Sequence, residues 1–106
     1  MTDVNPIFAE IEALLDDVTP RGLDEIEDTL TTGYATALAL EAERWRIERR
    51  ISELASQLGE RDVELHGAEE LVCLAQRLST TDTDLVRLRE RLASLRELAD
   101  AARAAA

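Results

Sequence analysis

Apolar residues recur at every third and fourth position from residue 23 to residue 58. This spacing continues without a slip through five seven-residue repeats, with Gly33 and Arg44 at two of its positions, which is typical of a long helix with a narrow apolar stripe. We call the stripe the seam; its members are Leu23, Ile26, Leu30, Ala37, Leu40, Ile47, Ile51, Leu54 and Leu58. At about 1.5 Å per residue the helix would be roughly 50 Å long. A helix cannot bury such a seam against itself, so we expect it to pack against other helices or a second chain.

Three shorter helices are predicted around this long one. The long helix is predicted over 20–58, and the shorter helices over 1–18, 60–78 and 82–104. The predicted breaks lie at Thr19-Pro20, near Gly59 and over the polar segment 79–84. Residues before proline leave the helical region, and glycine commonly ends a helix. The six residues at 79–84 all have low helix propensity. However, the leucine spacing continues in phase across them, so the alternative is a single continuous helix there.

The composition supports an all-α fold. Hydrophobic residues make up 45% of the chain but aromatic residues only 3%, and there are four Gly and two Pro. No segment alternates apolar and polar residues over the length of a strand. We predict one domain over 1–106, an antiparallel helical bundle or coiled coil built on one long central helix with three shorter helices.

The net charge of −11 excludes several classes of partner. A negative surface repels both phosphate backbones and anionic bilayers, so we expect neither nucleic acid nor membrane as a partner. No apolar segment reaches the length of about 18 residues that a membrane span requires. The N-terminal sequence does not resemble a signal peptide, and one Cys cannot form an internal disulfide. These features predict a cytoplasmic protein.

The charges of the long helix favour pairing with an inverted copy of itself. Four acidic residues lie at 24–28 and four arginines at 44–50. An antiparallel second copy would place these opposite charges beside each other and bury the seam between the two chains. This arrangement predicts a homodimer. The alternative is that the later helices of the same chain cover the seam.

The segment 44–50 is the locally basic part of this acidic chain. It contributes a candidate interaction patch, formed by Arg44, Trp45, Arg46, Arg49 and Arg50. Trp45 falls outside the seam, and Trp and Arg are enriched at the energetic centres of protein interfaces. The simpler interpretation is that Trp45 packs under another helix while the arginines pair with acidic helix surfaces.

Metal binding and catalysis have little support in the sequence. Asp62, His66, Glu70 and Cys73 share one helical face and are the weak candidates for metal ligands. A solvated His beside acids and a Cys packed as a small apolar residue explain the same pattern. There is no glycine-rich phosphate loop and no nucleophile with its own base. We therefore predict neither a metal nor a cofactor, and no catalytic residue.

These observations predict a non-enzymatic helical interaction module: an adaptor, an assembly chaperone or a regulatory partner. Its expected partners are a second copy of itself, through the seam, and an unidentified protein. The alternative is a helical bundle that binds a small anionic ligand, possibly as an enzyme, through the patch at 44–50.

Overall fold

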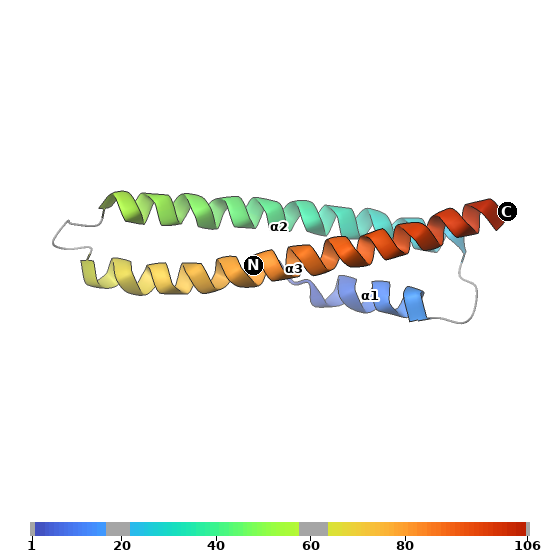
Figure 1. Cartoon of the computed structure of the whole chain (residues 1–106), viewed down its shortest axis with the longest axis horizontal. Coiled ribbons are helices and arrows are strands. Elements are labelled where there is room, and N and C mark those ends of the chain that lie inside the picture. Colours follow the sequence, from blue (N-terminus) through green and yellow to red (C-terminus); the bar gives the residue numbers. More distant parts are fainter. Residues whose placement is uncertain (1, 17–21, 58–63, 106) are drawn as a thin grey trace.

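The computed structural model describes residues 2–16, 22–57 and 64–105, and for Glu64 and Leu65 only the backbone is considered. Within these ranges the chain forms three helices, α1 (Asn5–Asp16), α2 (Leu23–Gln57) and α3 (Glu64–Ala105). Figure 1 shows α2 and α3 side by side and running in opposite directions, with α1 beside the C-terminal half of α3. The molecule is 66 Å long and 17 by 15 Å across. The all-helical fold class and the long central helix are confirmed.

Buried leucines hold α2 and α3 together. On α2 the residues Ile26, Gly33, Leu40, Ile47 and Leu54 are all buried, each seven residues after the last. On α3 the same seven-residue spacing connects the buried Leu85, Leu92 and Ala99. Residues seven apart therefore keep the same orientation toward the facing helix along each rod. Each fully buried leucine contributes about 1.5–3 kcal/mol relative to an exposed one.

The first helix covers only one end of the α2–α3 pair. Ile7, Phe8, Ile11 and Leu14 of α1 join one core cluster with the early part of α2 and the late part of α3. The backbone N–H of Asn5 donates to the Asp3 carboxylate at 3.0 Å, which caps the start of α1. At the other end the core consists of Ile47, Leu54 and Leu74 with half-buried neighbours, all from α2 and α3. The molecule is thus three helices thick at one end and two at the other.

The predicted break over 79–84 is wrong, because α3 continues through it. The separate helices at 60–78 and 82–104 are one helix from Glu64 to Ala105. Thr81 lies seven residues after Leu74 and, like it, is buried. The Thr83 hydroxyl donates to the Ser79 carbonyl inside the helix at 2.9 Å. Poor propensity costs at most about 0.7 kcal/mol per residue. Packing of Leu85 and its neighbours against α2 offsets that cost.

The seam of α2 is buried within the chain itself. Ile26, Leu30, Ala37 and Leu40 contact the core shared with α1 and α3, whereas Ile47 and Leu54 pack with Leu74. Leu23 and Ile51 are half-buried, and Leu58 lies outside the described residues. The intrachain alternative is therefore the arrangement in the structure. A dimer formed through this seam would require α3 to leave it.

Gly33 of α2 leaves room for the side chain of Leu92 of α3. A Cβ atom at this position would overlap Cδ2 of Leu92, which is itself buried. We expect Gly33→Leu to lower the free energy of unfolding by about 1–3 kcal/mol, because the added side chain overpacks the core. Urea denaturation followed by circular dichroism measures this change.

Ala35→Leu is the matched control for this prediction. Ala35 is exposed on the same helix, so the same new side chain should change stability by less than about 0.5 kcal/mol. Equal effects of the two substitutions would contradict the close packing at Gly33.

Candidate functional site

Trp45 is exposed on the outer surface of α2. Its side chain is 58% exposed, and the Arg49 guanidinium lies over the indole ring at 5.3 Å from the ring centre. A cation over an indole face is attracted by the ring quadrupole. The prediction that Trp45 lies outside the seam is confirmed, and the alternative that it packs under another helix is not what the structure has.

The four arginines of the predicted patch do not converge on one point. Nε of Arg44 lies 3.0 Å from both Glu48 Oε1 and Asp82 Oδ1. Arg50 donates from Nε and Nη2 to the two carboxylate oxygens of Glu70, at 2.8 and 3.1 Å. Arg46 and Arg50 both border a groove of about 430 Å³. Two of the four arginines therefore share one groove, and the patch as a whole is distributed around α2.

An apolar groove runs between α2 and α3 beside this patch. It has a volume of about 460 Å³, and its walls are formed by Tyr34, Ala37, Leu38, Glu41, Arg89, Leu92, Ala93 and Arg96. Leu38 is 66% exposed and Tyr34 is 44% exposed. An ion pair between Arg89 and Glu41 spans the groove from one helix to the other.

The groove belongs to a longer apolar face. Trp45 follows Leu38 by seven residues, and Val86 precedes Ala93 by seven. Since the seven-residue spacing is kept along both helices, these residues continue the same side of the molecule. We call this surface the open face and define it by Tyr34, Leu38, Trp45, Val72, Val86 and Ala93. Among the described residues it holds all the exposed large apolar side chains except Leu98.

The first helix lies on the other side of the α2–α3 pair. Glu12 of α1 pairs with Arg91 at 2.6 Å, and the Arg87 guanidinium lies 4.6 Å from the centre of the Phe8 ring. On the same side, the backbone N–H of Thr2 donates to Oε2 of Glu43 at 3.3 Å. Helix α1 therefore covers one side of the pair and leaves the open face uncovered.

Glu43 is a buried carboxylate beyond the start of α1. It is 4% exposed, and its Oε1 atom lies 3.8 Å from Nη2 of Arg77 without a hydrogen bond in the part of the chain that the structure describes. A buried carboxylate is unfavourable unless it is paired. The nearby guanidinium of Arg77 offsets part of this cost, so Glu43 connects α2 to α3 and to the start of the chain.

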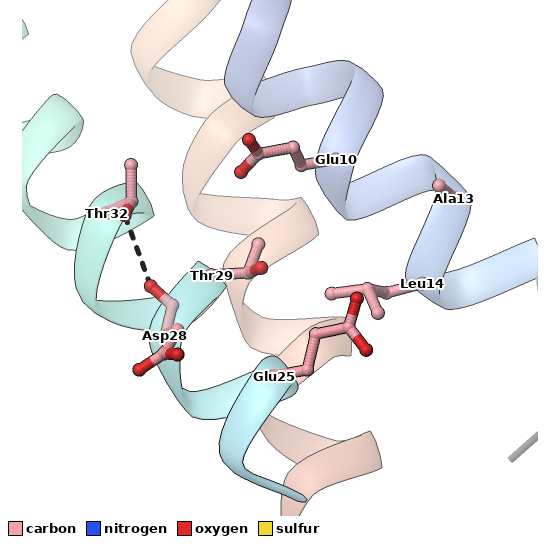
Figure 2. A pocket seen from close by; sticks show the side chains of 7 residues that line it. All are labelled: Glu10, Ala13, Leu14, Glu25, Asp28, Thr29 and Thr32. Atoms are coloured by element: carbon pink, nitrogen blue, oxygen red, sulfur yellow. Dashed lines mark hydrogen bonds between the residues drawn. The ribbon is translucent and has the colours of Figure 1, made fainter. Parts of the chain in front are cut away.

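A second groove lies between α1 and α2, and its rim is acidic (Figure 2). Glu10 of α1 and both Glu25 and Asp28 of α2 border it, with Leu14 and Thr29 at its wall. The Thr32 hydroxyl donates to the Asp28 carbonyl at 3.2 Å, the dashed line in Figure 2. This bond stays within one helix and orients no group toward the groove.

The weak metal candidates do not form a site in the described residues. No group of three His, Cys, Asp or Glu side chains there is arranged to hold a metal ion. Glu70 is paired with Arg50, while His66 and Cys73 are exposed. Asp62 lies outside the described residues.

The sequence did not single out Tyr34 and Leu38. Their signal was present, because Leu38 and Trp45 are two large apolar residues spaced by seven and outside the seam. Only the position of α1 shows that this second stripe faces away from the rest of the chain.

Comparison of the chain with known protein families, characterised proteins and solved structures gave no match. Across residues 2–16, 22–57 and 64–105, none of the helices has the length and apolar character needed to cross a membrane. The geometry of the chain itself therefore has to support any functional proposal.

The Arg50–Glu70 pair predicts a specific pH dependence. Hydrogen bonding to Arg50 lowers the pKa of Glu70 below its ordinary value of 4.5. Because the pKa of this carboxylate is lower in the folded state, its ionised form stabilises the fold at pH values above the ordinary pKa. This stability is lost as the pH falls through the folded-state pKa. We expect Glu70→Gln to be less stable than the parent at pH 7, with the difference shrinking as the pH falls below 4.5 and through the lowered pKa of Glu70. Urea denaturation at pH 7 and pH 3 measures this difference.

Glu69→Gln provides the control for this test. Glu69 is the exposed neighbour of Glu70 and makes no ion pair within the described ranges. Its substitution should give the same small change at both pH values. A Glu70→Gln penalty that persists at pH 3 would show that the pair is not its source.

Proposed function

We propose that the protein is a non-enzymatic helical interaction module that binds an amphipathic helix on its open face. The observation that carries this proposal is the gathering of Tyr34, Leu38 and Trp45 on one uncovered side of α2. Exposed apolar residues scattered singly are normal on a protein surface, but a contiguous set marks an interaction site. Trp and Tyr, with Arg beside them, are also the residues that dominate binding energies at interfaces.

The shape of the open face favours a helix as the bound element. The groove between α2 and α3 runs along the two rods, with Leu92 and Ala93 forming one wall and Tyr34 and Leu38 the other. A partner helix with apolar residues at seven-residue spacing would match the repeat that both walls follow. Arg96 at the rim would pair with an acidic residue that flanks the apolar stripe of such a helix.

An adaptor, an assembly chaperone or a regulatory partner would each use a surface of this kind. The cytoplasmic location stays a prediction. The anionic-ligand alternative also stays a prediction. Arg46 and Arg50 share a groove, but Glu43 and Glu70 line the same groove and Arg50 is already paired with Glu70, which gives this alternative less support than the open face has.

Site-specific photocrosslinking in living cells of the native host tests this proposal. A photoreactive amino acid at position 38 should give a crosslinked product of one defined mass, and mass spectrometry should locate the crosslink in a helical segment of the bound protein. Adding Trp45→Ala should reduce the yield severalfold, because it removes a large apolar contact next to the crosslinker.

Position 9 is the control for the crosslinking experiment. Ala9 is exposed on α1 and lies away from the open face, so the same photoreactive residue there should not give that product. Absence of a product at position 38, or equal products at both positions, would overturn the proposed function.

A further inference from the structure

We propose that the helix bound on the open face is α2 of a second copy of this chain, running antiparallel to the first. This inference rests on the proposed function and names its partner. The charges along α2 are self-complementary in this orientation, because acidic residues fill 24–28 and the arginines lie at 44–50. An antiparallel copy with the two α2 midpoints aligned brings Asp28 within one helical turn of Arg49 of the other chain. A parallel copy would place like charges side by side.

The apolar residues and the charges indicate the same register. When Leu38 of one copy lies opposite Ala42 of the other, Thr31 lies opposite Arg49 and Tyr34 lies within one residue of Trp45. Residue 40 is the midpoint of α2, which spans Leu23–Gln57. The register that pairs the aromatic residues therefore also overlaps the two α2 helices over nearly their whole length.

The open face is long enough for two copies to pair along it. Helix α2 has 35 residues, so the paired segment would be about 50 Å long at 1.5 Å per residue. Helix α1 lies on the opposite side and does not obstruct the approach. The intrachain core, including Leu40 and Leu88, stays intact when the dimer forms.

This dimer differs from one formed through the seam. The seam residues keep their intrachain contacts, and the second copy covers only side chains that the single chain leaves exposed, such as Leu38 and Trp45. No part of the fold has to open before the copies associate.

Analytical ultracentrifugation of the purified full chain tests the inference. We expect a concentration-dependent species of twice the 11.8 kDa chain mass. Leu38→Glu should weaken the dimer at least tenfold in Kd, because it places a charge at the centre of the apolar contact. Leu98→Glu is the matched control, since Leu98 is also an exposed leucine but lies off the open face. Circular dichroism of both variants checks that the helices remain.

Disulfide crosslinking tests the orientation of the two copies. In a Cys73→Ser background, a mixture of Thr31→Cys and Arg49→Cys chains should form the mixed disulfide. Thr31→Cys alone should not crosslink, because the two Thr31 positions would be about 27 Å apart along antiparallel helices at 1.5 Å per residue. Crosslinking of Thr31→Cys with itself, without the mixed product, would overturn the antiparallel arrangement.

The two proposals fail in different ways. A purified chain that stays monomeric at millimolar concentration, or a dimer that Leu38→Glu leaves unchanged, would overturn self-pairing on this face. If position 38 still crosslinks to a different protein in cells, the proposed function survives that result. If position 38 gives no crosslink at all, both proposals are wrong.

Discussion

The packing of the α2 seam against the leucines of α3 is the contact on which the rest of the structure depends. Both helices repeat their buried positions every seven residues, so each turn of one meets a turn of the other along the whole pair. This contact stabilises α3 through a segment of poor helix propensity and packs the Leu92 side chain against Gly33. The contact also determines which residues stay exposed to solvent, because it fixes the side of each helix that faces the other helix.

The contact between α2 and α3 leaves two lateral sides of the helix pair, and these differ. On one side α1 packs its apolar residues into the groove, supported by the Glu12–Arg91 ion pair and by Arg87 over Phe8. The other side has no helix from the described residues, and its apolar members stay exposed. The ion pairs Arg89–Glu41 and Arg103–Glu27 cross between the two helices on that open side. They link α2 to α3 but leave Leu38 and Trp45 uncovered.

The sequence pattern alone predicted the helical fold and the seam, because seven-residue spacing is a local property that sequence shows directly. The pattern could not decide whether α3 breaks near Thr81. The low helix propensity of the polar residues is a local property, whereas the packing energy that offsets it comes from residues of α2 that are distant in the sequence. Trp45 was identified from its position outside the seam. Tyr34 and Leu38 were missed because their exposure depends on where α1 packs. The divergence of Arg44 and Arg50 likewise depends on the positions of Asp82 and Glu70 on a different helix.

The short reach of α1 has a consequence for how the rod loses its structure. Near Leu40 the backbone is shielded by a third helix, whereas near Ile47 and Leu54 only two helices share a small core. Segments with few apolar contacts open at lower free energy than the rest of a protein. We therefore expect amide hydrogens of α2 after residue 47 to exchange with solvent sooner than those before residue 40, so that the end of the rod with two helices opens first.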